Sequence, residues 1–385
     1  MSLGISIYFG LDNTREENLG LLRLARSFGY ERIFTSLHIP EANYDILKQE
    51  INEFLVEAKK LNMDVVCDVS PKTFEFLGLN NMDLLSLIDI GIRTIRIDYG
   101  YTSKEIANLS KNKYGIKIQI NASTVSEEII NELVENNADF KNIEALHNFY
   151  PRKDTGISIE HMVACNEILK SKEIRIGAFI QSNNRKRSTF KEGLPTLEDH
   201  RGLHVSIAET ELYALGCDDI FIGDSLPSSK EIISLTKVSK NTKVLNNNVN
   251  RYIGRDESLN LAGNEKEIIL RIEILTDDEI SLELLKKKYT ARQDEARDVI
   301  RTNESRAYLE DNIINDDGKK DGLRKSGDIT IDNLNYGRYM GEIQLVKNEC
   351  YLDSKSNLVA RVIKEDLGLL GNILGGRNFS FKIVY

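Results

Sequence analysis

Three carboxylates stand near the ends of short β-branched segments of the sequence: Asp68, Asp98 and Glu144. Side chains of this type can protonate a leaving oxygen or stabilise a positively charged centre, and cleavage of a glycosidic bond requires both actions. Carboxylates also serve aldolases, isomerases and metal-dependent hydrolases. These residues therefore predict an active site with acid and base chemistry, without choosing among those reactions.

Two basic segments are suited to an anionic ligand. Residues 150–156 and 181–188 each follow a predicted strand and combine cationic side chains with hydroxyl groups. Arginine side chains and clustered N–H groups are good phosphate ligands, so the two segments together favour a phosphate site. The alternative is that both are solvated surface loops.

The histidines and cysteines do not predict a metal site. The five histidines are spread along the chain, and the four cysteines form no C-x-x-C pair. No G-x-G-x-x-G motif follows the first predicted strand, which weakens a dinucleotide-binding interpretation. We therefore expect neither a metal ion nor another cofactor. His147 and His200 lie at a strand end and in a loop, and are better site candidates than the other histidines.

An alternation of strand and helix patterns runs through the first 240 residues. The predicted strands are 4–10, 32–37, 64–70, 94–100, 117–123, 142–149, 175–182 and 218–225. Amphipathic helical patterns such as 18–28 and 46–60 lie between them, and Ser126 precedes acidic residues in a favourable helix start. Eight alternations favour a closed (β/α)8 TIM barrel over an open doubly wound sheet.

The remaining 145 residues lose this alternation. Short strand patterns at 267–275, 327–331, 339–345, 358–363 and 379–384 are bounded by Gly, Asn and Asp, which favours a small mostly-β barrel or sandwich. The acidic and basic run 316–322 is expected to be a solvated loop and not a calcium loop. We therefore divide the α/β chain into domains 1–240 and 241–385.

Polar residues of the predicted barrel strands share the parity that points into the lumen, since the apolar residues take the other parity. Unpaired buried polar groups cost about 1–3 kcal/mol each, so this set must pair internally or bind a polar ligand. The internal alternative pairs Arg96 with Asp68 or Asp98. A site would lie at the carboxyl ends of the strands. The set includes Tyr8, Asp68, Arg96, Asp98, Gln119, Asn121, Glu144, Asn148 and Gln181.

The composition excludes several classes of protein. A balance of 51 Lys and Arg against 60 Asp and Glu gives a net charge of −9, which argues against a general nucleic-acid binder. No run of eighteen apolar residues occurs, and the first residues lack the features of a secretory signal. We expect a cytoplasmic protein with no nucleic-acid or membrane partner.

Five segments carry a family resemblance: GISIYFG at 4–10, IRIDYG at 95–100, HNFYPRKDTGIS at 147–158, GLPTLEDHR at 193–201 and GDITIDNLNYGRYMGEIQ at 327–344. They resemble the bacterial cytosolic 6-phospho-N-acetylmuramidases, long described as uncharacterised outer surface proteins. The resemblance implies a TIM barrel followed by a cyclophilin-like β-barrel domain. It also implies hydrolysis of the β-1,4 bond of N-acetylmuramic acid 6-phosphate–N-acetylglucosamine in peptidoglycan recycling.

Such a substrate carries a 6-phosphate and a lactyl carboxylate, and this suggests roles for the candidate residues. Our hypothesis is that Asp98 and Glu144 flank the scissile bond, with Asp68 as the first substitute for either. Arg201 or Arg338 is expected at the lactyl carboxylate, unless Arg201 pairs with Glu198. The four cations expected at the phosphate are Arg152, Lys153, Arg185 and Arg187. The further substrate-binding residues are Tyr8, Arg96, Asn121, His147, Asn148 and Gln181.

Two other functions compete with a glycosidase. A phosphosugar aldolase or isomerase would need a Schiff-base lysine or a metal, and Lys117, the one lysine inside a predicted strand of the barrel, stands at the strand's start. A non-catalytic carbohydrate-binding protein at the cell surface would need a secretory signal or a lipidated cysteine near the start of the chain. A homo-oligomer is compatible with each of these functions.

Overall fold

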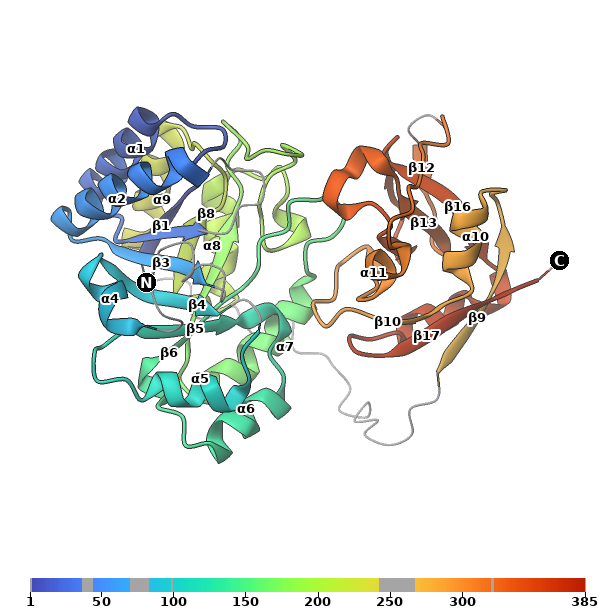
Figure 1. Ribbon diagram of the computed structural model, residues 1–385, viewed down its shortest axis with the longest axis horizontal. Helices are drawn as coiled ribbons and strands as arrows, with labels where there is room; N and C mark the ends of the chain where they lie inside the picture. Colours follow the sequence, from blue (N-terminus) through green and yellow to red (C-terminus); the bar gives the residue numbers. More distant parts are fainter. Residues whose placement is uncertain are drawn as a thin grey trace. The chain divides into compact units, whose positions relative to one another are not determined.

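The computed structural model describes residues 2–36, 44–69, 83–97, 100–241, 267–319 and 322–384. The chain divides into two compact units (Figure 1). The first unit combines Met1–Lys153 with Ile159–Ile253, and the second combines Asp154–Ser158 with Gly254–Tyr385. Asp98, one of the two expected catalytic residues, lies outside the described residues.

Eight parallel strands close the first unit into a barrel, because β8 pairs with β1 as well as with β7. The (β/α)8 barrel expected from the sequence is confirmed, and every one of its eight predicted strands is present. The strands are β1 (Ser2–Ile7), β2 (Arg32–Ser36), β3 (Asp64–Val69), β4 (Ile92–Ile97), β5 (Lys117–Asn121), β6 (Ile143–Leu146), β7 (Arg175–Ile180) and β8 (Asp219–Ile222).

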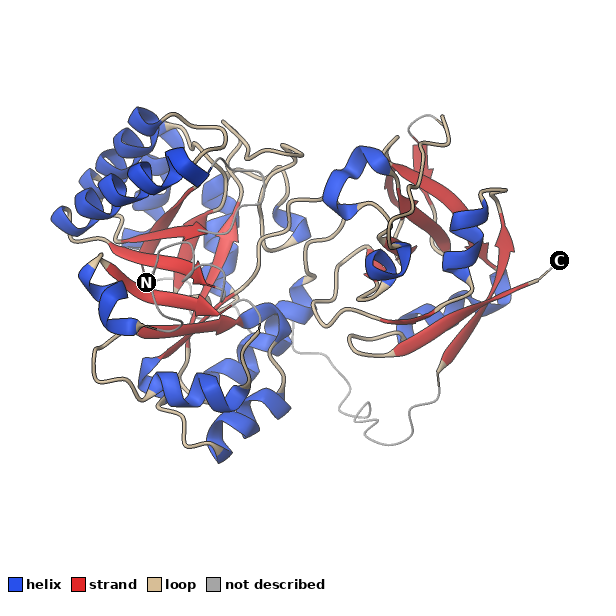
Figure 2. Ribbon diagram, viewed as in Figure 1, coloured by secondary structure: helices blue, strands red, loops and turns tan. Residues whose placement is uncertain are grey.

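Helices surround these strands (Figure 2). They are α1 (Arg15–Ser27), α2 (Tyr44–Lys60), α4 (Leu84–Asp89), α5 (Ser103–Ser110), α6 (Glu127–Glu135), α7 (Ile159–Lys170), α8 (Val205–Ala214) and α9 (Ser229–Asn241). Several begin with a side-chain cap that occupies otherwise unpaired amide groups. Thr14 and Glu17 form a capping box at α1, and Ser126 caps α6 as its sequence pattern predicts.

Side chains inside the barrel form layers, because alternate residues of each strand point into the lumen. The middle layer is aromatic. Phe34 of β2 and Phe221 of β8 both contact Phe179 of β7, with ring centres 5.0 and 5.6 Å apart. Gly4 of β1 makes room for this layer, since a Cβ atom there would come within 2.3 Å of the Phe221 ring. Polar side chains occupy the layers before and after it.

The second unit is mostly β, as expected for a small β domain that follows the barrel. Its main sheet is curled as a half-barrel of seven strands in the order β10-β17-β9-β16-β13-β14-β11, and β12 pairs with β15 separately (Figure 2). The strands are β9 (Ile268–Ile274), β10 (Lys288–Thr290), β11 (Val299–Arg301), β12 (Gly322–Arg324), β13 (Asp328–Asp332), β14 (Ile343–Val346), β15 (Cys350–Leu352), β16 (Ser356–Val362) and β17 (Asn378–Ile383).

The five longer strand patterns of this unit were predicted, whereas β10, β11, β12 and β15 were not. Each missed strand has only three residues, too few to show an alternation. The unit also contains α10 (Glu279–Leu285), α11 (Ser305–Leu309) and the 3-10 helices η7 (Leu334–Tyr339) and η8 (Lys364–Asn372). The segment Asp154–Ser158 joins it through a β-bridge between Ile157 and Ala296.

Candidate active site

A buried ion cluster surrounds Arg32 at the amino-terminal ends of the barrel strands. The Arg32 guanidinium donates hydrogen bonds to Asp64 at 3.0 Å, Glu144 at 2.7 Å and Asp219 at 2.6 Å. Burial raises the pKa of the Asp219 carboxyl, but hydrogen bonds and charge from Arg175 and Arg32 outweigh burial and leave this pKa below its usual value. The cluster therefore consists of opposite charges that pair with one another, two arginines with three carboxylates.

Glu144 belongs to this cluster, which corrects its expected place at the carboxyl end of its strand. It is the second residue of β6, and its carboxylate pairs with Arg32, the first residue of β2. Its side chain does point inward, as the parity predicts. The expected strand, 142–149, extends beyond both ends of β6, so the position of Glu144 along the barrel axis was wrong. The aromatic layer lies between Glu144 and the carboxyl ends of the strands.

A second polar network lies beyond the aromatic layer, at the carboxyl ends of β3, β4 and β6. Arg96 is buried and donates hydrogen bonds to Asp68 at 2.9 Å and to the Asn148 side chain at 2.5 Å. The alternative in which Arg96 pairs with Asp68 is therefore confirmed. The Asp68 side chain is 20% exposed, so this carboxylate is both paired and accessible.

Tyr8 and Phe149 form an edge-to-face aromatic pair beside this network. The Arg187 guanidinium lies over both rings, 4.8 Å from the centre of Tyr8 and 5.2 Å from that of Phe149. The charges of Arg187 and Asp68 both affect the pKa of the Tyr8 hydroxyl, so both side chains are within electrostatic reach of this ring. Burial is the main cause that raises the pKa of Tyr8 above its usual value, so this tyrosine stays neutral.

Three carboxylates hold the basic segment 181–188 in place. Asp224, after β8, accepts hydrogen bonds from the backbone amides of residues 182, 187 and 194. Glu231 of α9 accepts from the Ser182 hydroxyl at 3.0 Å and from the backbone of residue 183 at 2.8 Å. Asp12, after β1, accepts from the backbone of Ser188 at 2.7 Å. The segment is therefore an anchored loop, in which the backbone amides of residues 182, 183, 187 and 188 donate to protein carboxylates.

Arg185 and Arg201 already contact protein oxygens. Arg185 donates to Glu17 at 2.8 Å. Arg201 donates to both oxygens of Glu198, at 2.5 and 2.8 Å, and to the backbone carbonyls of residues 150, 152, 192 and 193. The pairing of Arg201 with Glu198, weighed as the alternative to a substrate contact, is confirmed. Arg201 joins the loops after β6 and β7.

Four further residues expected at the site differ in burial and in hydrogen-bond partners. Arg152 is buried and Lys153 is exposed, next to each other in the loop after β6. Gln181 is buried at the end of β7, and its amide donates to Asn183 at 2.7 Å. Asn121 accepts from the backbone of residue 123 at 2.9 Å and so caps the 3-10 helix η1 (Ala122–Thr124).

His147 is fully buried behind the Arg96 network. Its ring nitrogens contact Ser123 at 3.1 Å and Asn166 at 2.9 Å. Burial is the main reason that its pKa falls to about 4, so the ring is neutral near pH 7. A direct contact between this ring and a substrate, as the sequence suggested, is not supported by such complete burial.

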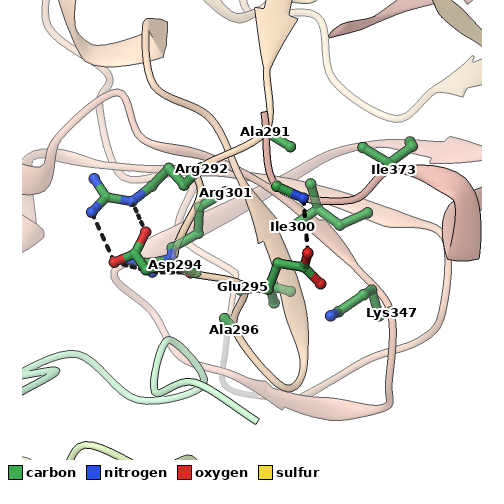
Figure 3. Close-up of a pocket in the computed structure, with 11 residues that line it drawn as sticks. Ala291, Arg292, Asp294, Glu295, Ala296, Ile300, Arg301, Lys347 and Ile373 are labelled. Atoms are coloured by element: carbon green, nitrogen blue, oxygen red, sulfur yellow. Dashed lines mark hydrogen bonds and ion pairs between the residues drawn. The ribbon is translucent and has the colours of Figure 1, made fainter. Parts of the chain in front are cut away.

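Arg338 belongs to the second unit, where it is exposed and lies 5.2 Å from the centre of the Tyr339 ring. A small charged hollow occurs elsewhere in that unit (Figure 3). In it, Asp294 accepts from Arg292 at 2.9 Å and pairs with Arg301 at 3.1 Å. No residue expected at the active site lines this hollow.

Sequence reasoning missed the residues that hold the site in position, namely Asp12, Ser123, Asn166, Asp224 and Glu231. Only one of them left a local signal. Ser228 and Glu231 stand three apart at the start of α9 and exchange hydrogen bonds in a capping box, a spacing that is readable from sequence. The others act across long sequence separations, so no local pattern marks them.

The described residues were also compared with the requirements of a metal site and of a membrane-spanning helix. Nowhere in them do three or more His, Cys, Asp or Glu side chains gather as a metal ion would require. Every helix they contain is too short or too polar to cross a lipid bilayer.

The chain matches two family models and resembles proteins whose structures have been solved. Residues 3–237 match the family model described as 6-phospho-N-acetylmuramidase, N-terminal, and residues 268–382 match 6-phospho-N-acetylmuramidase, C-terminal. A conserved Enterococcus faecalis protein of unknown function is 29% identical with a TM-score of 0.56, over 100% of this chain and 96% of that one. An uncharacterised B. cereus protein is 27% identical with a TM-score of 0.53, over 99% of both chains. No curated protein is significantly similar. With both of its family models matched in order, the chain belongs to the 6-phospho-N-acetylmuramidase family.

Proposed function

We propose that this protein is a cytoplasmic glycoside hydrolase that cleaves the β-1,4 bond of N-acetylmuramic acid 6-phosphate–N-acetylglucosamine during peptidoglycan recycling. The family supports a muramidase that acts on a phosphorylated sugar. The specific disaccharide is our inference from that family and from the chemistry of the barrel mouth.

One observation supports the proposal most strongly: at the carboxyl ends of the strands, an arginine that has no ion pair among the described residues and an accessible carboxylate, Asp68, both act on Tyr8. Arg187 forms no ion pair among the described residues, and its Nε atom is buried without a hydrogen-bond partner there. An arginine in this state is suited to a phosphate, which accepts two parallel hydrogen bonds from a guanidinium. The half-buried Phe149 ring beside it offers an apolar surface to a sugar, whereas the Tyr8 ring, expected at the substrate, is buried beneath Arg187 and supports that guanidinium instead.

The phosphate would be bound by side chains and not by the backbone of the loops. Many barrels bind phosphate with the loops after the seventh and eighth strands and a helix N-terminus. Here Asp224 and Glu231 accept hydrogen bonds from three backbone amides of the loop after β7, those of residues 182, 183 and 187. Arg187, together with Arg152, Lys153 and Arg185, is therefore our candidate set for the 6-phosphate, with Arg187 as the principal contact.

We assign catalysis to Asp68 and Asp98. Asp68 is ion-paired with Arg96, which suits a carboxylate that faces the positive charge developing at the anomeric carbon. Asp98 follows the last residue of β4 in sequence and is our candidate for the acid that protonates the leaving oxygen. Glu144 is excluded from this assignment because it pairs with Arg32 in the amino-terminal layer.

The experiment is to incubate the purified protein with the 6-phosphorylated disaccharide and to follow the products by mass spectrometry. We expect N-acetylmuramic acid 6-phosphate and N-acetylglucosamine. The unphosphorylated disaccharide is the matched control, and we expect it to be cleaved far more slowly because it cannot engage Arg187. No cleavage of either disaccharide would refute the proposed function, and equal cleavage of both would refute the phosphate assignment.

A further inference from the structure

A buried polar chain lies behind the candidate active site, and its contacts begin at Ser123. Ser123 is fully buried in η1, the 3-10 helix that follows β5. Its hydroxyl oxygen lies 3.1 Å from Nδ1 of His147 and accepts a hydrogen bond from the backbone amide of Asn148 at 3.0 Å. The hydroxyl therefore links the His147 ring to the backbone of the next residue.

The hydrogen bonds determine which ring nitrogen of His147 carries the proton. Asn166 donates through Nδ2 to the Leu215 carbonyl at 3.0 Å, so its Oδ1 atom faces His147 Nε2 at 2.9 Å. An amide oxygen only accepts hydrogen bonds, so Nε2 carries the proton and Nδ1 is the acceptor. The Ser123 hydroxyl then donates to Nδ1 and keeps its lone pair for the Asn148 amide.

The chain continues from Asn148 to the accessible carboxylate. The Asn148 side chain accepts from Arg96 at 2.5 Å, and Arg96 donates its other terminal nitrogen to Asp68 at 2.9 Å. A shift of the Asn148 backbone would therefore move the Arg96 guanidinium, and with it the carboxylate that it orients.

We propose that His147 and Ser123 are positioning residues, which fix Asn148 and thereby the Arg96–Asp68 pair without contacting the substrate. The inference rests on the proposed function, because Asp68 has a catalytic role only if the protein is a glycosidase. The neutral, single-tautomer state of His147 follows from full burial between Ser123 and Asn166. His147 is thus a structural acceptor and not a proton donor to substrate.

The test compares two buried serines that each accept a hydrogen bond from a distant backbone amide. Ser110 of α5 is also fully buried, donates to the Ala107 carbonyl at 2.8 Å and accepts from the Asp139 amide at 2.8 Å, but it lies outside this chain. We expect Ser123→Ala to lower kcat by roughly 10- to 100-fold, since a small misplacement of catalytic groups has an effect of this order. KM should change little. Ser110→Ala should lose similar stability and retain kcat.

Two further measurements separate positioning from general damage. Combining Ser123→Ala with Asn148→Ala should lower kcat no further than Asn148→Ala alone, because both act through one path. Additive losses, or equal kcat in the two serine variants, would overturn the inference. The amide of Asn148 should exchange hydrogen faster in Ser123→Ala, and unchanged exchange would also overturn it. Hydrogen exchange can be measured without enzyme activity, so it tests the positioning role even in an inactive protein. An inactive wild-type protein would refute only the proposed function.

Discussion

The Arg187 guanidinium lies 4.8 Å from the centre of the Tyr8 ring, and the Tyr8 hydroxyl donates to the Gly223 carbonyl at 2.7 Å. The ring is therefore held at its hydroxyl by the residue that follows β8, and it carries a cation over one face. Because Tyr8 stays neutral, it holds Arg187 through its ring face and leaves the guanidinium edge for an anion.

Replacement of Arg187 by lysine should impair recognition of the phosphate selectively. Lysine keeps the charge but cannot form two parallel hydrogen bonds, so we expect KM for the 6-phosphorylated disaccharide to rise by about tenfold or more. Steady-state kinetics measure this. Arg23→Lys is the matched control, because Arg23 forms an exposed ion pair with Glu57 on the helices of the barrel. An unchanged KM in Arg187→Lys would remove Arg187 from the phosphate site.

Asp68 and Asp98, our candidate catalytic residues, should respond differently to amide replacement than Glu144 of the amino-terminal layer. Asp68→Asn and Asp98→Asn should each lower kcat by about 100-fold or more, as expected when a catalytic carboxyl is removed. Glu144→Gln should keep kcat near the wild-type value and lower Tm, because Arg32 loses one of its buried partners. If Glu144→Gln were the inactive variant and Asp68→Asn the active one, our assignment would be reversed.

The stability of the second unit should depend on an ion pair between residues that are far apart in the sequence. Asp154 accepts from Arg324 at 2.6 Å, and the Arg324 side chain is only 3% exposed. Asp154→Asn leaves a buried guanidinium without its counter-charge, so the free energy of unfolding should fall by about 3–5 kcal/mol. Denaturant unfolding measures this quantity. Asp317→Asn, which breaks the more exposed pair with Lys319, should change it by less than about 1 kcal/mol. Equal losses in the two variants would contradict the prediction.

Glu209 of α8 should make stability depend on pH. Burial raises the pKa of its carboxyl from 4.5 to about 9 in the folded protein. The unfolded chain releases this proton above its ordinary pKa, so the contribution of Glu209 to stability falls as pH rises from 4.5 towards 9. Glu209→Gln cannot ionise, and its Tm should exceed that of the wild type by several degrees at pH 8 and by little at pH 5. Thermal melts at both pH values test this, and an equal difference at both would contradict it.

Local patterns in the sequence were sufficient to predict the barrel. Alternating apolar residues and breaks at Gly, Asn and Asp mark each of the eight strands, because both the pleat of a strand and the period of a helix act over a few residues. The same parity correctly directed Arg96 and Glu144 into the lumen, and the pairing of Arg96 with Asp68 was among the alternatives it raised.

The tertiary structure decided what each inward side chain does. Glu144 and Asp68 have the same parity and charge, yet one pairs with Arg32 before the aromatic layer and the other lies beyond it. Their positions along the barrel axis depend on strand ends and on register between neighbouring strands, which no single segment encodes. Ser123 likewise acquires its role only when the ends of β5 and β6 meet, because a hydrogen bond requires two groups that folding brings together.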